Sequence, residues 1–456
     1  MLTTLGLRNF KSWREIQPLS LGPITGLFGS NSSGKTSILQ LLLVLKQTAE
    51  SSDRSLALDL GDAHSYVELG TLRDVQWNHE EVPVSWRLDW TLSKPLDVPD
   101  PDHLGQTLFS GRSLSHSAEV VRGKGGRPIV RRMSYDFAQH GFELKAKGVG
   151  KGYELAVTPE DATDAFRLRR TRGRAWDLPA PYKSYGFPDQ INTYFQNAAF
   201  LSDFVLEFET LLEQVRYLGP LREYPKRQYT WAGAQPTDVG ARGERVVDAL
   251  LAARAGGLKV NVGPGRRHPF LEEYVADWLR KLGLISEFSV AEVAEGSNLY
   301  QVKVRRTGDA TEVLLTDVGF GVSQILPIIV LLFYSPPGSV VILEQPEIHL
   351  HPSVQAGLAD VLIDAVARGR IQIIVESHSE HLLQRLQRRI AEQAASSDDV
   401  RLYFCDFRDA ESTISPLEVD VFGNIANWPR GFFGDPLGEM SAMSQAVTAR
   451  TTAGGA

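Results

Sequence analysis

The fold of this chain is decided by one stretch, Gly29-Ser30-Asn31-Ser32-Ser33-Gly34-Lys35-Thr36. An apolar run, Ile24 to Phe28, precedes it and predicts a buried strand, and an apolar helical pattern runs from Lys35 to about Lys46. A strand, a loop that contains glycine and a helix N-terminus together predict a phosphate-binding loop (P-loop), because backbone N–H groups and the helix dipole then face the negative charge. We therefore expect Gly29 to Ser37 to bind a nucleoside triphosphate.

A bound triphosphate needs a basic side chain for its phosphates, a metal ion, and a carboxylate that holds the metal. Lys35 is expected to reach the β- and γ-phosphates, and the hydroxyl of Thr36 to coordinate Mg²⁺. A second apolar run, Val340 to Leu343, ends in Glu344. Ligands bind at the carboxyl edge of open parallel sheets, so Glu344 is predicted to hold the Mg²⁺, directly or through a water.

Two further segments are expected at the same edge. The small-residue loop that contains Gly321, Ser323 and Gln324 opens an apolar helix and predicts a second anion-binding turn. The apolar run Ile371 to Val375 leads through Glu376 and Ser377 to His378. A histidine there can hydrogen-bond a γ-phosphate or an attacking water.

The chain is predicted to consist of a nucleotide-binding core and an insertion. Residues 1–92 contain two short alternating strands and the P-loop, and the compact strand–helix pattern returns at 311–405. In residues 93–310, glycine, proline and charged residues occur throughout. We interpret this segment as an inserted α+β region. Residues 406–456 form a short C-terminal segment with a tail expected to be disordered from Thr451. The fold is therefore expected to be α/β, with a mostly parallel sheet covered on both faces.

The composition is that of an ordinary soluble protein, with 43 % hydrophobic and 23 % charged residues among 456. A single cysteine, Cys405, excludes an internal disulfide framework and favours a cytoplasmic location. The most apolar stretch, Ile325 to Phe333, is too short to span a bilayer, so we expect no membrane association. The net charge of −7 argues against a uniformly basic nucleic-acid binder and permits a local basic face.

These motifs, in this order, resemble those of the ABC-type ATPases. The similarity is greatest to the soluble RecF/SMC/OLD-like branch found among bacterial AAA-labelled ATPases. It rests on Leu5 to Trp13, on the stretch from Glu344 to Pro352, on Gly321 to Gln324 as the signature loop and on His378 as the switch histidine. More narrowly, Tyr217 to Arg222 and the ending Asn427 to Phe433 are similar to a subgroup that carries a short C-terminal domain of unknown function.

The resemblance implies a mechanism and partners. Two protomers would sandwich two ATP molecules with Mg²⁺, each nucleotide bound by the P-loop of one protomer and the signature loop of the other, with Ser323 contacting the γ-phosphate. Closure on ATP and release after hydrolysis would depend on γ-phosphate contacts, which ADP lacks. Members of the branch are often encoded with nucleases or other effectors in anti-phage systems, so an effector protein is an expected partner.

One residue departs from the pattern of these enzymes. Where most of them have a catalytic glutamate after the first acid, this chain has Gln345. An amide can position a water but cannot accept its proton. We expect slow hydrolysis, with Glu347 or His378 assisting. The alternative that Glu347 itself is the general base remains open. The signature loop also departs, since Val322 stands where a second glycine is usual.

Other patterns leave alternatives open. His349, His351, His378 and His381 do not have the spacing of a zinc site. A basic stretch with interleaved aromatic residues fits a DNA or RNA face, a solvated sheet face or a surface for an acidic partner; its arginines include Arg131, Arg132, Arg169, Arg170, Arg172 and Arg174. Trp428, Phe432 and Phe433 are interpreted as a staple onto the core.

The sequence therefore predicts a slow ATPase that dimerises on ATP and couples its nucleotide state to an effector, plausibly in antiviral defence. One alternative is a DNA-repair ATPase that binds DNA ends directly. Another is a non-hydrolysing scaffold that senses ATP, which Gln345 favours.

Overall fold

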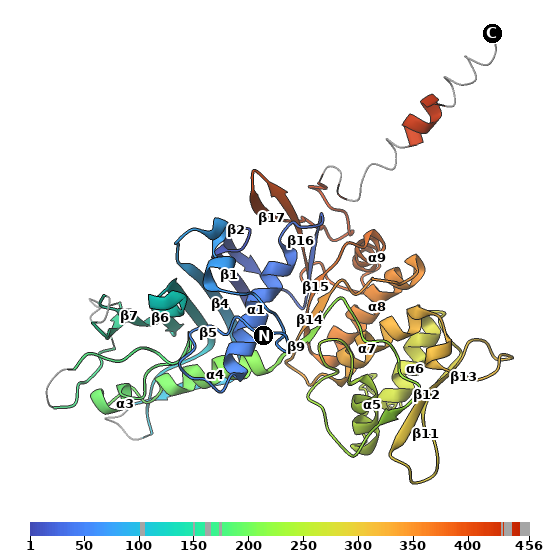
Figure 1. The fold of residues 1–456 in the computed structure, drawn as a ribbon, viewed down its shortest axis with the longest axis horizontal. Helices are drawn as coiled ribbons and strands as arrows, with labels where there is room; N and C mark the ends of the chain where they lie inside the picture. The colour runs from blue at the N-terminus through green and yellow to red at the C-terminus, as the bar shows by residue number, and fades with distance from the viewer. Residues whose placement is uncertain are drawn as a thin grey trace.

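The computed structural model describes residues 1–100, 105–148, 151–159, 166–172, 176–429, 432 and 440–446. Arg174, Phe433 and the tail from Thr451, all named in the sequence predictions, lie outside the described residues. Figure 1 shows a central sheet with a lobe on either side of it.

The central sheet carries the P-loop at the end of one of its inner strands. Its six strands follow the order β17–β16–β3–β15–β14–β9, and only β17 runs antiparallel to its neighbour. The strands are β17 (Glu411–Pro416), β16 (Val400–Arg408), β3 (Ile24–Gly29), β15 (Gln372–Glu376), β14 (Val340–Glu344) and β9 (Val215–Leu218). Because β3, β15, β14 and β9 are parallel, the residues that follow them meet at one edge.

Both faces of the central sheet are buried, which explains its continuous apolar runs. Val340 and Ile342 belong to a core with α1 (Lys35–Glu50) and α4 (Leu201–Glu213). Val341 and Leu343 belong to the opposite core, with α7 (Phe320–Tyr334), α8 (Pro352–Gly369) and α9 (Glu380–Ala391). The predicted α/β fold with a mostly parallel sheet covered on both faces is confirmed.

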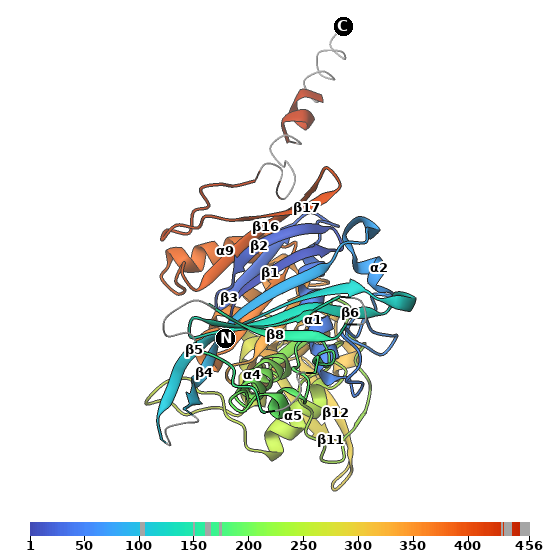
Figure 2. The ribbon, with the colours of Figure 1, turned by 90° about the vertical axis from the view of Figure 1, so that its left-hand side faces the viewer.

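A seven-stranded antiparallel sheet covers one side of α1 (Figure 2). The predicted N-terminal strands form its first hairpin, and strands of the inserted region continue it. In spatial order it contains β2 (Trp13–Ser20), β1 (Leu2–Phe10), β4 (Val84–Pro99), β5 (Thr107–Arg122), β6 (Pro128–Phe137), β7 (His140–Ala146) and β8 (Tyr153–Thr158). Residue 92 lies inside β4 and residue 405 inside β16, and the division into domains stays a prediction.

The other lobe combines helices with a small antiparallel sheet. That sheet contains β10 (Tyr229–Thr230), β12 (Leu299–Arg305), β11 (Glu287–Glu292) and β13 (Val313–Leu314). The remaining helices are α2 (Leu72–Val75), α3 (Ile191–Tyr194), α5 (Val246–Ala255) and α6 (Leu271–Lys281), with short 3₁₀ turns at Trp77–His79, Lys124–Gly126 and Leu315–Asp317. Among the described residues, no helix is both long and apolar enough to cross a bilayer.

The segment after the last parallel strand is built into the core. Strand β17 pairs with β16, which itself pairs with the P-loop strand β3. Phe432 is buried against Phe28, the residue before the P-loop, and against Phe404, with ring centroids 6.3 and 4.7 Å apart respectively. Trp428 packs on Phe432 at 5.2 Å, as the staple interpretation expects.

Gln372 joins the antiparallel sheet to the central sheet. Its side-chain oxygen accepts the Leu2 N–H at 3.0 Å, and its amide nitrogen donates to the carbonyls of Leu2 at 2.8 Å and Gly22 at 3.0 Å. Only 2 % of Gln372 is exposed, so water cannot replace these bonds.

We predict that Gln372→Met lowers the free energy of unfolding by about 2–4 kcal/mol, because buried groups left without a partner cost about 1–3 kcal/mol each. The measurement is thermal unfolding followed by circular dichroism. Gln17→Met, at an exposed position of β2, is the matched control and should leave the midpoint unchanged. Equal midpoints for Gln372→Met and the native protein would contradict this role.

Candidate nucleotide site

The P-loop has a shape that only glycine allows at two positions. Gly29 has φ +142°, and a Cβ there would lie 1.9 Å from the carbonyl oxygen of Cys405. Gly34 has φ +87°, and a Cβ there would lie 2.5 Å from the Ser412 hydroxyl and 2.7 Å from that of Ser12. Both glycines are therefore required by neighbours from other segments as well as by backbone conformation.

Two hairpins meet at the loop. The indole N–H of Trp13 donates to the carbonyl of Gly34 at 2.9 Å. The C-terminal hairpin β16–β17 supplies Ser412, which lies against Gly34 and whose hydroxyl and backbone N–H donate to the hydroxyl and carbonyl of Ser12, the neighbour of Trp13, at 2.6 and 2.9 Å. The P-loop is thus fixed by the first hairpin of the chain and by the last one.

Lys35 begins α1 and is buried under the loop. Its ammonium donates to the carbonyls of Gly29 at 3.2 Å and Ser30 at 2.7 Å, and to the hydroxyl of Ser33 at 3.2 Å. Burial lowers its pKa, while the charge of Glu376 opposes that shift. Phosphate oxygens are stronger acceptors for an ammonium than these neutral groups, so the loop fits a triphosphate.

The rest of the predicted loop is placed around this lysine. Ser30, Asn31 and Ser32 are exposed, as ligand-contacting residues need to be. Ser37 is buried in the first turn of α1, where its N–H bonds to the Gly34 carbonyl at 3.0 Å.

Two carboxylates lie side by side at the ends of neighbouring strands. Glu344 ends β14 and Glu376 ends β15, and the two are register partners with 6 % and 2 % of their surface exposed. The pKa of Glu344 is raised to about 8, first by burial and then by the charge of Glu376. Burial is also the main cause of the raised pKa of Glu376.

Glu376 was not among the predicted site residues. The hydroxyl of Thr36, the predicted metal ligand, donates to its two carboxylate oxygens at 3.0 and 2.8 Å. The signal was present in the sequence, since Glu376 ends an apolar strand just as Glu344 does. Sequence reasoning assigned that strand end to His378 alone.

Gln345 turns the chain away from β14 toward the neighbouring strand. It has φ +43°, and its N–H donates to the Glu376 carbonyl at 2.8 Å. Its side-chain amide also hydrogen-bonds the Glu376 carboxylate, which favours the ionised form of that acid. The amide at position 345 therefore supports a carboxylate on the adjacent strand.

Glu347 and His378 are in direct contact. The N–H of His378 donates to Oε1 of Glu347 at 2.6 Å, while Oε2 of Glu347 is buried without a hydrogen bond. Burial raises the pKa of Glu347. The pKa of His378 is lowered by burial and then by Lys35, and its interaction with the backbone of Gly29 places it beside the loop.

The adjacent strand β9 brings two more polar groups to this edge. The hydroxyl of Tyr217 faces Glu344, and its pKa is raised first by burial and then by the charge of that acid. Arg222 is 6 % exposed, and two of its guanidinium nitrogens have no hydrogen-bond partner. Burial lowers the pKa of Arg222 to about 10, while the charge of Glu347 opposes the shift.

The predicted signature turn lies on the other lobe, at the start of α7. Gly321 packs against Leu284, and the Ser323 hydroxyl donates within its own helix to the Phe320 carbonyl at 2.8 Å. Gln324 is 3 % exposed. In the described part of the chain no hydrogen bond joins this turn to the P-loop, so the structure does not bring the two together in one protomer.

The predicted histidines do not converge on a metal. Within the described ranges there is no group of three or more histidine, cysteine, aspartate or glutamate side chains that could hold one. His351 is instead the N-cap of α8 and accepts the N–H of Ser353. The apolar helical pattern that follows Ser353 predicts that residue as the cap, but this prediction is wrong because Pro352 already occupies the first helical position.

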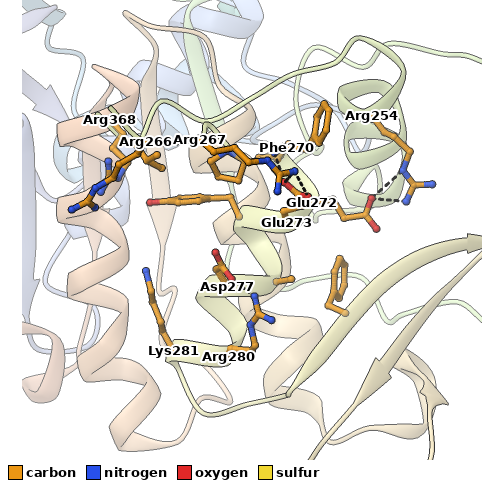
Figure 3. A pocket seen from close by; sticks show the side chains of 16 residues that line it. Arg254, Arg266, Arg267, Phe270, Glu272, Glu273, Asp277, Arg280, Lys281 and Arg368 are labelled. Carbon is orange, nitrogen blue, oxygen red and sulfur yellow. Dashed lines mark hydrogen bonds and ion pairs between the residues drawn. The ribbon is translucent and has the colours of Figure 1, made fainter. Parts of the chain in front are cut away.

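A groove of about 770 Å³ runs along α6, away from the P-loop (Figure 3). It is lined by several arginines, but the acids beside them form ion pairs with three of these: Arg254 with Glu272, Arg267 with Glu273 and Arg280 with Asp277. This groove is not part of the nucleotide site.

Comparison with known families identifies the core. A family model described as "AAA domain, putative AbiEii toxin, Type IV TA system" matches residues 24–384. The chain belongs to this family. A second model, described as "Protein of unknown function (DUF3696)", matches residues 396–443, which include β16 and β17. The predicted class, a P-loop ATPase domain followed by a short C-terminal domain of unknown function, is confirmed.

Solved structures that this chain resembles include SMC head domains. That of Thermotoga maritima is 12 % identical with a TM-score of 0.39, and the match covers 92 % of this chain and 99 % of that one. An SMC head bound to the C-terminal winged-helix domain of ScpA is 11 % identical with a TM-score of 0.45, covering 92 % and 98 %. None of the curated proteins matches this AAA-family chain.

We predict that Glu344→Gln stabilises the nucleotide-free protein more at pH 8 than at pH 5. Folding raises the pKa of this carboxyl from about 4.3 in the unfolded chain. Between the unfolded and the folded pKa, the folded state keeps a proton that the unfolded state has lost. The free energy of unfolding therefore falls as the pH rises through this range. Removing the carboxyl should raise Tm at pH 8 by at least about 2 °C. The measurement is thermal unfolding in EDTA, with Glu68→Gln as an exposed control. Equal shifts at both pH values would show a packing effect instead.

Proposed function

We propose that this AAA-family protein binds ATP with Mg²⁺ and hydrolyses it slowly, and that it couples the nucleotide state to a partner. The observation that carries the proposal is the convergence of Lys35, Thr36 and Glu344 at one edge of the sheet. Lys35 would bind the β- and γ-phosphates, and Thr36 and Glu344 would hold the metal, which supplies charge neutralisation for phosphoryl transfer.

Slow hydrolysis follows from the residues beside the phosphates. Gln345 can orient a water but not deprotonate it. His378, whose lowered pKa favours the neutral ring, and Glu347, which it contacts, are the groups available to accept a proton. We propose that they assist, and that ATP stays bound long enough to act as a switch.

Dimerisation would complete each nucleotide site. The turn that contains Gly321, Ser323 and Gln324 opens a helix N-terminus with an exposed Phe320 beside it. Since this turn makes no hydrogen bond to the P-loop of its own protomer within the described residues, we propose that it contacts the γ-phosphate held by a second copy. Closure would then report the presence of the γ-phosphate.

The partner is proposed to be an effector protein such as a nuclease, in anti-phage defence, with a DNA-repair role as the alternative. The basic stretch supports the nucleic-acid role only weakly. Arg131 pairs with Glu119 at 3.2 Å, and Arg132 pairs with Glu119 at 3.7 Å and Glu143 at 3.5 Å, as on a solvated sheet face. A scaffold that senses ATP without hydrolysing it is a further alternative.

We predict that Lys35→Ala lowers Mg²⁺-dependent affinity for ATP by at least about tenfold, because the ammonium is the buried cation that faces the phosphates. The measurement is isothermal titration calorimetry with a non-hydrolysable ATP analogue. Lys124→Ala, on an exposed turn, is the control. A native protein without Mg²⁺-dependent affinity for ATP would refute the proposed function.

We predict that direct DNA binding, if it is the function, appears as ATPase activity stimulated by DNA and lost on charge reversal at Arg131, Arg132, Arg169 and Arg170. Reversal of the exposed Arg242, Arg266, Arg306 and Arg388 is the matched control. Turnover that DNA does not change would favour an effector protein as the partner.

A further inference from the structure

We propose that Glu376 is a second carboxylate of the magnesium site, beside Glu344. The inference rests on the proposed function and deepens it, because it assigns the metal site a residue from a third strand end. Four observations carry it.

The first is the position of Glu376. It ends β15, the strand between the P-loop strand β3 and the acid strand β14. Its register partners are Glu344 on one side and Leu27, two residues before Gly29, on the other. In the central sheet β15 is the strand that pairs with both the P-loop strand and the acid strand.

The second is its contact with Thr36. The hydroxyl that a P-loop supplies to Mg²⁺ here donates to both oxygens of Glu376, at 3.0 and 2.8 Å. Mg²⁺ binds oxygen at about 2.0–2.1 Å in octahedral geometry, in which adjacent ligands lie about 2.9 Å apart. The separation between the Thr36 and Glu376 oxygens is therefore that of two neighbouring ligands of one ion.

The third is the charge. Glu344 and Glu376 are both buried, and the two lysines whose charges act on them make their hydrogen bonds elsewhere. Lys35 donates to Gly29, Ser30 and Ser33, and Lys11 donates to Gln40. Two buried carboxyls without an ion pair stay protonated or take a cation from outside, so a metal ion bound between them would favour their ionised forms. Because no larger metal-binding group exists among the described residues, phosphate oxygens and waters would complete the shell, as is usual for Mg²⁺.

The fourth is the amide at position 345. Gln345 donates to Glu376 through its side chain and to the Glu376 carbonyl through its backbone. A glutamate at 345 would face Glu376 with a like charge, whereas the glutamine fixes it. An amide at position 345 is therefore compatible with an ionised acid at position 376, whereas a second acid at 345 would repel it.

The experiment measures metal binding directly, with Mn²⁺ as the probe and electron paramagnetic resonance as the readout. The full-length protein is saturated with a non-hydrolysable ATP analogue and titrated with Mn²⁺. We expect Glu376→Gln to weaken Mn²⁺ binding by about tenfold or more while leaving the affinity for the analogue in EDTA unchanged. Glu68→Gln, at an exposed position, should bind Mn²⁺ like the native protein.

A second variant guards against a folding defect. Glu376→Asp retains the charge on a shorter side chain, and we expect Mn²⁺ affinity between those of the native protein and Glu376→Gln. Thermal unfolding in EDTA checks that both variants are folded.

The remaining outcomes distinguish failure of the role of Glu376 from failure of the proposed ATP-binding function. Native Mn²⁺ affinity in Glu376→Gln would overturn the role of Glu376 and leave ATP binding intact. Loss of analogue affinity in EDTA would also overturn it, because Glu376 would then act on the loop rather than on the metal. A native protein that binds neither analogue nor Mn²⁺ would refute the proposed function itself.

Discussion

Burial of two like charges at one sheet edge is the constraint around which the nucleotide site is arranged. Glu344 and Glu376 end adjacent parallel strands, and burying both carboxylates costs free energy that a bound cation can offset. Thr36, Gln345 and Tyr217 all direct polar groups at them. Burial of the two carboxylates therefore lowers the stability of the empty fold, and any cation that binds between them stabilises the folded state.

The P-loop itself depends on segments that are distant in sequence. Cys405 packs against Gly29 and Ser412 against Gly34, so the region matched as a domain of unknown function shapes the phosphate-binding backbone. Phe432 adds a contact below the loop strand. This region is therefore structurally part of the ATPase core, whatever further role it has.

Local patterns allowed much of the site to be predicted from the sequence. The strand, loop and helix around Lys35 are contiguous, and so is the strand that ends in Glu344. Glu376 was missed because its importance depends on the pairing of β14 with β15, which periodicity does not reveal. The seven-stranded sheet was likewise not predicted as one unit, because its first hairpin and the insertion are separated by the P-loop and α1.

The pairing of β3 has a consequence for how the protein is made. Its two neighbours, β15 and β16, lie more than 300 residues after it, whereas β4 to β8 are arranged in chain order. On the ribosome the antiparallel sheet can form early, while the P-loop strand waits without partners until residues 372–408 have emerged. The phosphate-binding loop therefore takes its final shape late in folding, because the strands on both sides of it are made late.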